Sequence, residues 1–174
     1  VILATGVCER AVPFPGWTLP GVMFAGGVQA TLKAHGIRAG DRVVVAGAGP
    51  LPLAVGAQLI DASATVPAVA MVNSVYSMLR HPLALWAGRD IVREGMTYMS
   101  RLRGAGTELL QGCIPVRAEG DQQLRRVVLA RHDGGRPVPG TERAIDCDIL
   151  AINFGFVANS ELARMAGAET AFDP

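Results

Sequence analysis

The chain has 174 residues, of which 50% are hydrophobic and 18% are charged, and its formal net charge is +1 at pH 7. A chain of this kind can bury the core of one domain of ordinary size, with some appendages. The balanced charge, without any basic run, argues against a nucleic-acid or strongly acidic partner. No apolar segment reaches the roughly 18 residues that a membrane span needs.

The three cysteines lie far apart in the sequence, at Cys8, Cys113 and Cys147. This spacing fits neither a zinc-ligand set nor a C-x-x-C redox pair. Because unpaired cysteines are typical of a reducing compartment, we expect a cytoplasmic protein without a metal site.

The first residues, 1–6, are apolar and begin without a methionine. This pattern predicts a buried strand, and we expect the chain to be a segment cut from a longer protein. Residues 11–21 are predicted to be an irregular connector, because they are rich in proline and glycine. A short helix is predicted at 25–35, with Gly36 in the position that ends it.

The stretch that follows, residues 42–59, predicts a nucleotide-binding turn. A β-branched apolar run is typical of a buried parallel strand, and the glycines after it let the chain turn into a helix. Gly47 permits the tight turn, and Gly49 leaves no side chain between the backbone and a phosphate, which the free N–H groups of the new helix would bind. The predicted cofactor-binding residues of this turn are Gly47, Ala48, Gly49, Pro50 and Leu51.

Two departures from the dinucleotide fingerprint leave the ligand open. The third glycine of G-x-G-x-x-G is replaced by Pro52, which the first turn of a helix tolerates. The acidic residue that usually binds a ribose about 20 residues later is missing. Asn73 stands in that neighbourhood and could hydrogen-bond a ribose, and Arg80 could meet a 2′-phosphate. The alternative is a Rossmann-like domain that has kept the turn and lost its ligand.

The remaining elements alternate first as strand and helix and then as strands alone. A strand is predicted at 65–72, and a helix from 82 to about 103 has one apolar face formed by Val92, Met96, Met99 and Leu102. Trp86 and Tyr98 of this helix are expected to pack in the core. A strand at 107–110, an antiparallel meander through 131 and a returning strand at 145–152 follow. These elements predict an α/β fold with a Rossmann-like parallel sheet, helices and an antiparallel meander.

No group of residues in the chain indicates catalysis. His35, His81 and His132 stand in turns or at helix ends, without a nucleophile motif such as G-x-S-x-G. Asp146 and Asp148 share one face of a strand, but we expect Asp148 to have a structural role at the start of that strand. Any hydride transfer would be carried out by cofactors, which the protein positions.

The order of these elements resembles that of the two-dinucleotide-binding-domain flavoproteins of the pyridine nucleotide-disulfide oxidoreductase superfamily. Residues 1–6 are similar to their A-T-G segment, and residues 147–155 are similar to their aspartate-led return strand. Residues 155–162 resemble their G-x-x-P-N-x-x-L turn, with Ala158 in place of the usual proline.

A narrower resemblance covers nearly the whole chain. Glu9-Arg10, the run P-F-P-G-W-T-L-P-G-V at 13–22 and the run E-L-A-R-M-A-G-A at 161–168 resemble the flavoprotein α subunits of opine oxidases, hydrogen cyanide synthase and bacterial proline or hydroxyproline dehydrogenases. The proline-rich run is specific, whereas the glycine turn alone is weak evidence.

The resemblance implies an NAD(P)-binding-type domain at 25–152. Residues 1–24 would be the end of the first half of an FAD-binding domain with a connector, and 153–174 the start of its second half. NAD(P) or ATP would occupy the glycine turn, and Thr5 and Gly6 would approach FAD in the intact protein only. The FAD diphosphate motif is missing from this chain, so we expect it not to bind FAD firmly.

The resemblance also implies a function. The chain would belong to an FAD-dependent oxidoreductase subunit that oxidises an amine or opine with a second flavoprotein subunit, and this segment alone would be inactive. The alternative is a scaffold for subunit contact that binds no ligand. Methionine-rich surfaces would favour this alternative, because flexible thioethers suit interfaces; the residues are Met71, Met78, Met96 and Met99.

Overall fold

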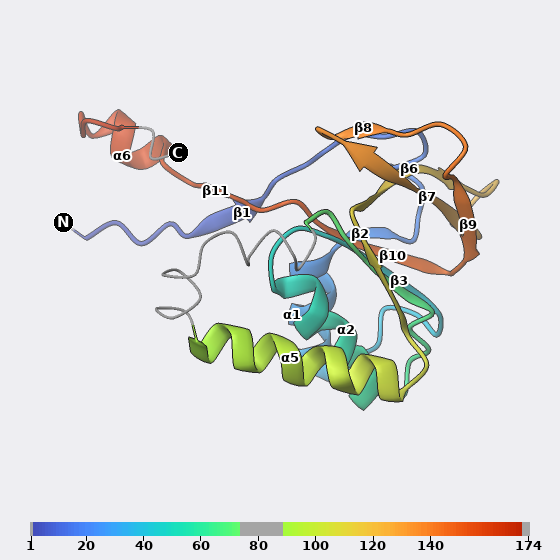
Figure 1. Cartoon of the computed structure of the whole chain (residues 1–174). Helices are drawn as coiled ribbons and strands as arrows, with labels where there is room; N and C mark the ends of the chain where they lie inside the picture. The colour runs from blue at the N-terminus through green and yellow to red at the C-terminus, as the bar shows by residue number, and fades with distance from the viewer. Residues whose placement is uncertain (1, 74–88, 172–174) are drawn as a thin grey trace.

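A computed structural model of the chain describes residues 2–73 and 89–171 (Figure 1). Within these residues, five strands form a central sheet in the order β2–β10–β3–β4–β5, and every pairing is parallel. The strands are β2 (Val22–Phe24), β10 (Ile149–Asn153), β3 (Val43–Gly47), β4 (Ala68–Met71) and β5 (Glu108–Gln111). The predicted strand before the glycine turn is thus confirmed as β3, in the middle of the sheet.

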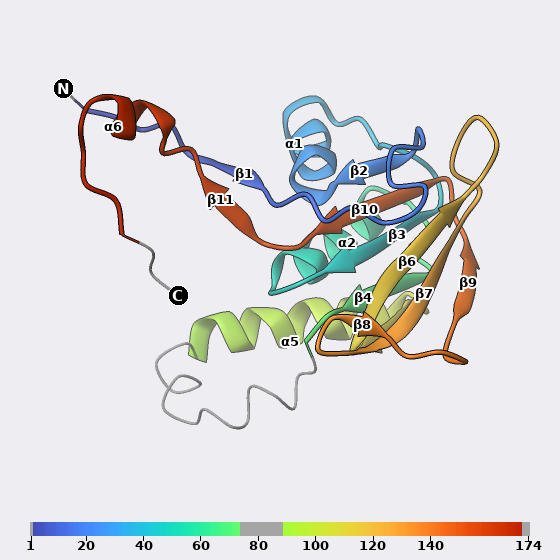
Figure 2. The same cartoon turned by 90° about the horizontal axis from the view of Figure 1, so that it is seen from above.

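The central sheet lies between a layer of helices and a layer of antiparallel strands (Figures 1 and 2). The helices are α1 (Ala25–His35), α2 (Leu51–Asp61) and α5 (Arg89–Gly104). The meander on the opposite face is β6 (Cys113–Glu119), β7 (Arg126–Asp133), β8 (Arg136–Pro137) and β9 (Arg143–Asp146). This arrangement confirms the predicted fold class.

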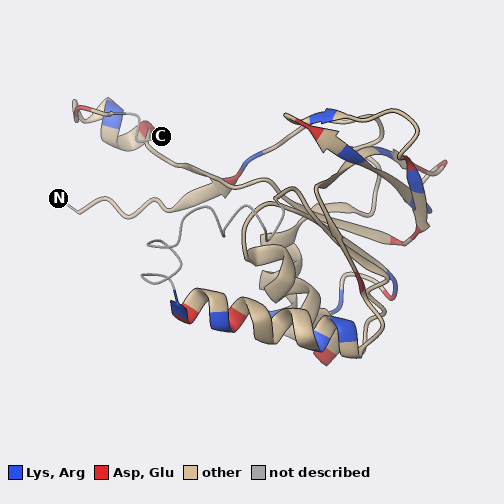
Figure 3. Ribbon diagram, in the orientation of Figure 1, with Lys and Arg blue, Asp and Glu red and all other residues tan. Residues whose placement is uncertain are grey.

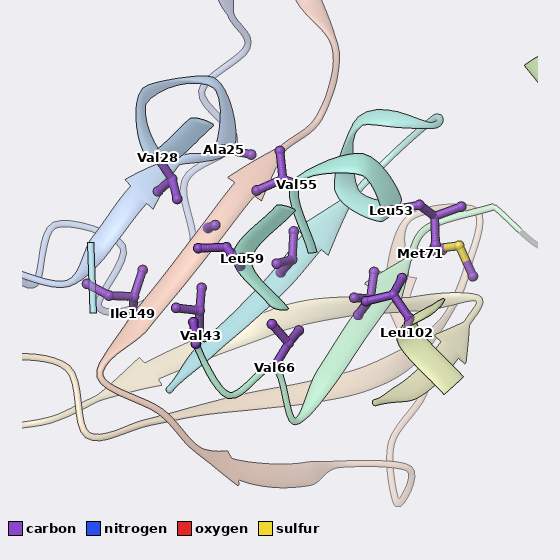
Figure 4. Packing of buried hydrophobic residues seen from close by; sticks show 14 residues of the cluster. Ala25, Val28, Val43, Leu53, Val55, Leu59, Val66, Met71, Leu102 and Ile149 are labelled. Carbon is purple, nitrogen blue, oxygen red and sulfur yellow. The ribbon is translucent and has the colours of Figure 1, made fainter. Parts of the chain in front are cut away.

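Alternate residues of β3 belong to two different cores. Val43 and Val45 pack with the helices in one hydrophobic cluster, which Figure 4 shows from close by. Val44 and Ala46 pack with the meander in a second cluster, and all four side chains are fully buried. Because side chains alternate across a strand, a strand covered on both faces must be apolar throughout, as the sequence pattern indicated.

The ends of the first two helices and of β10 follow the local sequence signals. Gly36 ends α1 in the left-handed conformation, with φ 65°, and its N–H donates to the Leu32 carbonyl. Pro52 lies in the first turn of α2, where a missing N–H costs no helical hydrogen bond. The Asp148 carboxylate accepts the N–H groups of Asp41 and Arg42, which confirms its structural role before β10.

The N-terminal and C-terminal segments of the chain form a two-stranded ribbon that extends away from the central sheet (Figure 1). In this ribbon, β1 (Val7–Glu9) pairs antiparallel with β11 (Phe156–Ala158), and α6 (Glu161–Met165) follows. The prediction of a buried strand at 1–6 is wrong for residues 2–6, which are exposed and lie outside any strand. Their apolar side chains have no sheet to cover them, and Ile2 is 94% exposed.

The long helix α5 is described from Arg89 to Gly104, and residues 82–88 of the predicted helix, with Trp86, lie outside the described residues. Its predicted apolar face is correct only in part. Leu102 is fully buried, and Met99 and Tyr98 pack against the helix-side core. Met96, however, is 62% exposed.

We expect Leu102→Ala to lower the free energy of unfolding by about 2–5 kcal/mol, because it leaves a cavity between α5, α2 and the sheet. The matched control on the same helix is Met96→Ala, which should change it by less than about 0.5 kcal/mol because the side chain is exposed. Urea unfolding followed by circular dichroism measures both values. Equal losses in the two variants would contradict the assignment of the buried face.

Cys147 gives a pH-dependent prediction. Burial in the meander-side core, together with the charge of Asp148, raises the pKa of the Cys147 thiol to about 12. Unfolding therefore releases its proton at a lower pH, so stability should fall as pH rises from 9.0, the ordinary value, toward 12. This fall should be smaller in Cys147→Ala.

The same burial should also protect the thiol from alkylation. In the folded chain at mildly alkaline pH, iodoacetamide should modify the exposed Cys8 and spare Cys147. Mass spectrometry of the peptides identifies the modified residue, and denaturant should make both cysteines reactive. Equal labelling rates in the folded chain would show that the Cys147 thiol is accessible.

Candidate functional site

The glycine turn (residues 47–51) joins β3 to α2 at the carboxyl edge of the central sheet. Both neighbouring strands fix it by backbone hydrogen bonds. The Ala48 N–H donates to the Asn153 carbonyl at the end of β10 (2.7 Å), and the Val72 N–H, just after β4, donates to the Gly47 carbonyl (2.9 Å). The turn is therefore held in place before any ligand binds.

The two glycines of the turn have different structural roles, and that of Gly47 differs from the tight turn expected of it. A Cβ atom on Gly47 would lie 1.9 Å from the Asn153 carbonyl oxygen, so this position must be glycine to let β10 approach. The residue that makes the left-handed turn is Gly49, with φ +74°. A Cβ atom on Gly49 would meet nothing within 4 Å, so the space beside its backbone is open.

This open space contains unused hydrogen-bond donors. Within the described part of the chain, the N–H groups of Gly49 and Leu51 make no hydrogen bond. The N–H groups of Leu53 and Ala54 donate to the Pro50 carbonyl, and Pro52 has none. The first turn of α2 is fully described and carries no acidic residue. Free amides at a helix N-terminus without a nearby carboxylate favour an anion.

The neighbouring helix α1 also starts at this edge, but its N-terminus is already occupied. One oxygen of the Glu9 carboxylate accepts the Gly26 N–H (2.9 Å), and the other accepts the side-chain amide of Asn153 (2.6 Å). Asn153 is only 2% exposed, so this hydrogen bond satisfies a buried amide. The chain's own carboxylate thus fills the anion site of α1, whereas that of α2 is open.

The pairing of Glu9 with Asn153 does not follow from the sequence pattern. The available signal was Asn153 itself, a polar residue at the end of a wholly apolar strand, because a buried amide needs a partner. Its partner, Glu9, lies 144 positions away and follows no spacing rule.

Asn73 lies beside the glycine turn, as a ribose-binding residue would require. Met71, the last residue of β4, pairs with Gly47, and Asn73 follows Met71 by two positions as an exposed residue. Arg80, the candidate for a 2′-phosphate, lies outside the described residues, and so does His81.

Thr5 and Gly6 directly precede β1 of the ribbon, which extends away from the central sheet and its glycine turn (Figure 1). The Thr5 hydroxyl donates to the Asn159 carbonyl, and the Asn159 side-chain amide donates to the Thr5 carbonyl (3.0 Å). Thr5 and Gly6 are both exposed. The chain therefore presents two groups of predicted cofactor-binding residues, one on the sheet and one on the ribbon.

The charged residues form no further site among the described residues. Lys, Arg, Asp and Glu are spread over α5, the meander and the loops, while β3 and β10 carry none (Figure 3). Asp146 is exposed and forms an ion pair with Arg126 (3.6 Å). The described residues contain no group of three or more His, Cys, Asp or Glu side chains that could hold a metal ion. Their helices include none that is both long and apolar enough to cross a membrane.

Comparison with curated proteins relates the chain to subunits of oxidoreductases. No family model matches it. It is 36% identical over 173 residues to hydrogen cyanide synthase subunit HcnB of Pseudomonas aeruginosa, a match that covers 99% of this chain and 37% of the relative. It is 32% identical over 174 residues to an opine oxidase subunit of Agrobacterium tumefaciens, covering 97% of this chain and 32% of the relative. The chain thus spans about a third of the length of these relatives.

Solved structures share its fold. An FAD-dependent pyridine nucleotide-disulphide oxidoreductase from Desulfovibrio vulgaris matches with a TM-score of 0.62 at 23% identity, over 97% of this chain and 38% of the other. L-proline dehydrogenase from P. horikoshii matches with a TM-score of 0.52 at 16% identity, over 98% and 24%. The expected resemblance is confirmed: the chain is homologous to segments of HcnB and of opine oxidase subunits and has the fold of the FAD-dependent pyridine nucleotide-disulfide oxidoreductases.

Proposed function

We propose that this chain is the nucleotide-binding domain of an FAD-dependent oxidoreductase subunit that oxidises an amine or opine substrate, at a carbon–nitrogen bond, with a partner subunit. One observation carries the proposal. Of the two helices that start directly after strands β2 and β3, α1 has its N-terminus filled by Glu9, whereas α2 presents open N–H groups at Gly49 and Leu51. Of these two helix starts, that of α2 is the one open to an anionic ligand.

The ligand we propose for the glycine turn is NAD(P) or ATP. The amides of Gly49 and Leu51 would bind its phosphates, and Asn73 would hydrogen-bond its ribose. A bound nicotinamide would supply the hydride chemistry, while these residues only hold and orient the nucleotide. In the intact protein, Thr5 and Gly6 would approach FAD. We expect the 174-residue chain alone to be catalytically inactive.

The names of the relatives support the substrate class and the partner. The opine oxidase relative belongs to an enzyme named for a substrate that contains a carbon–nitrogen bond, and the printed names of this relative and of HcnB identify both as subunits. We infer that the partner of this chain is a second flavoprotein subunit. The three free cysteines, all in the described part of the chain, fit a cytoplasmic location for the assembly.

A second candidate is a scaffold without a ligand. It is favoured by Asn73, a neutral residue where a ribose-binding carboxylate is usual, and by Pro52, which removes one N–H donor from the helix start. Among the described residues, only part of the methionine-rich surface expected for this role is exposed: Met71 is buried and Met99 packs against the core. Met96 is exposed, and Met78 lies outside the described residues.

Isothermal titration of the chain with NADH, NADPH and ATP tests the first candidate. At least one of the three should bind, and Gly49→Trp should weaken that binding roughly ten-fold or more, because the indole would fill the space beside the turn. The matched control is Gly36→Trp, a glycine with similar φ and open surroundings at the far end of α1. The control should bind as wild type does.

The outcomes separate the two candidates. If none of the three nucleotides gives heat, the nucleotide-binding proposal fails for this chain. If the chain binds no nucleotide but co-purifies with the partner subunit, and if Gly49→Trp leaves this co-purification unchanged, the scaffold role is established instead.

A further inference from the structure

One histidine of the meander contacts the carboxyl edge of the central sheet. His132 lies near the end of β7 and is half-buried. One ring nitrogen, Nε2, is 2.9 Å from the Val72 carbonyl oxygen, and the other, Nδ1, accepts the Gly135 N–H at 3.1 Å. The side chain therefore joins the turn after β7 to the segment that follows β4.

The hydrogen bonds determine where the proton of the ring is. Because Nδ1 accepts the Gly135 N–H, it carries no proton of its own. The proton is then on Nε2, which donates it to the Val72 carbonyl. The ring of His132 is thus fixed at both nitrogens, as a donor at Nε2 and an acceptor at Nδ1.

The residue that His132 contacts, Val72, lies beside the glycine turn. The N–H of Val72 donates to the Gly47 carbonyl (2.9 Å), and its carbonyl accepts from His132. Val72 is therefore held from both sides, by the glycine turn and by the meander. The next residue is Asn73, and the Val72 carbonyl belongs to the peptide bond that joins the two residues. The direction of Asn73 therefore depends on how this peptide bond is oriented.

The ring of His132 is not needed to pair β7 with its own sheet. The backbone N–H of His132 donates to the Gly112 carbonyl, and the residue pairs with Pro137 of β8. These contacts belong to the backbone and are available to other residues. The side chain itself makes two hydrogen bonds: one crosses to the Val72 carbonyl, and the other, with the Gly135 N–H, orients the ring.

We propose that His132 is a positioning residue of the nucleotide site: through the Val72 carbonyl it holds Asn73 beside the glycine turn, where Asn73 binds the ribose of the ligand. This inference rests on the proposed function, because it gives Asn73 a ligand to bind. His132 itself does not touch the nucleotide. Its effect on binding passes through Val72 and Asn73.

One substitution that removes both hydrogen bonds and two that keep one each test the proposal. His132→Leu removes both bonds and should weaken nucleotide binding roughly five-fold, the value of about one hydrogen bond. His132→Gln places an amide N–H near the position of Nε2 and should restore most of the affinity. His132→Asn reaches only the Nδ1 position, so it keeps the Gly135 contact, loses the Val72 contact and should bind as weakly as His132→Leu. The control is His35→Leu, an exposed histidine at the end of α1.

A double-mutant cycle separates positioning from a general loss of stability. If His132 acts through Asn73, His132→Leu should cause no further loss of affinity when Asn73 is already alanine. Hydrogen exchange at the Val72 amide gives a readout that needs no nucleotide. This amide should exchange faster in His132→Leu and His132→Asn than in His132→Gln, while circular dichroism shows that all variants are folded.

Each result has a definite meaning. Titration of the wild-type chain with NADH, NADPH and ATP comes first, and absence of binding would overturn the proposed function and this inference together. If wild type binds but His132→Leu binds equally well, only the role of His132 is wrong. Additive losses in the cycle with Asn73→Ala, or failure of His132→Gln to restore binding, would likewise overturn it while leaving the nucleotide site in place.

Discussion

The structure depends on the close approach of β10 to β3 at Gly47. The Asn153 carbonyl lies where a side chain on Gly47 would be, and from there it accepts the N–H of Ala48, the first residue of the loop. β10 comes about a hundred residues after β3 in the sequence but lies directly beside it, between β2 and β3. The glycine turn is therefore completed only when the chain after the meander has returned to the sheet.

The same asparagine joins the ribbon to the sheet. Its backbone carbonyl fixes the glycine turn, and its side-chain amide donates to Glu9 at the end of β1. The next hydrogen bond along the ribbon runs from the Arg10 N–H to the Gly155 carbonyl (2.8 Å). The two segments of the ribbon are thus tied together where they leave the sheet. A shift of the ribbon against the sheet would have to break the Glu9 contacts first, and these satisfy a buried amide.

Local signals in the sequence predicted the helices and strands but not the contacts between them. The apolar run of β3, the helix end at Gly36 and the tolerated Pro52 each depend on a few neighbouring residues, and all three are found as predicted. An apolar run indicates a need for burial but not what buries it. The same kind of pattern therefore predicted β3 correctly and residues 2–6 wrongly, because no sheet covers the latter.

At the candidate site, too, local spacing could be predicted from the sequence and long-range contacts could not. Gly47, Gly49 and Asn73 could be chosen from motif spacing, which follows the order strand, turn, helix, strand. The contacts of Glu9 with Asn153 and of His132 with Val72 join residues 144 and 60 positions apart, and no period links them. The exposed Met96 and the buried Met71 have the same side chain, so composition alone could not assign them to surface or core.

Because this chain departs from the dinucleotide fingerprint, the orientation of each hydrogen-bonding group at the proposed nucleotide site gains importance. Pro52 removes one N–H from the start of α2, and Leu53 and Ala54 use theirs on the Pro50 carbonyl, so the open donors at this turn are those of Gly49 and Leu51. The ribose partner proposed here, Asn73, has no charge and would form weaker hydrogen bonds than a carboxylate does. With fewer donors and a neutral partner, nucleotide binding would depend more on how well each group is oriented, since a misdirected amide gains nothing from the ligand. A side chain that fixes the Val72 carbonyl would therefore have more effect on affinity here than beside a complete fingerprint.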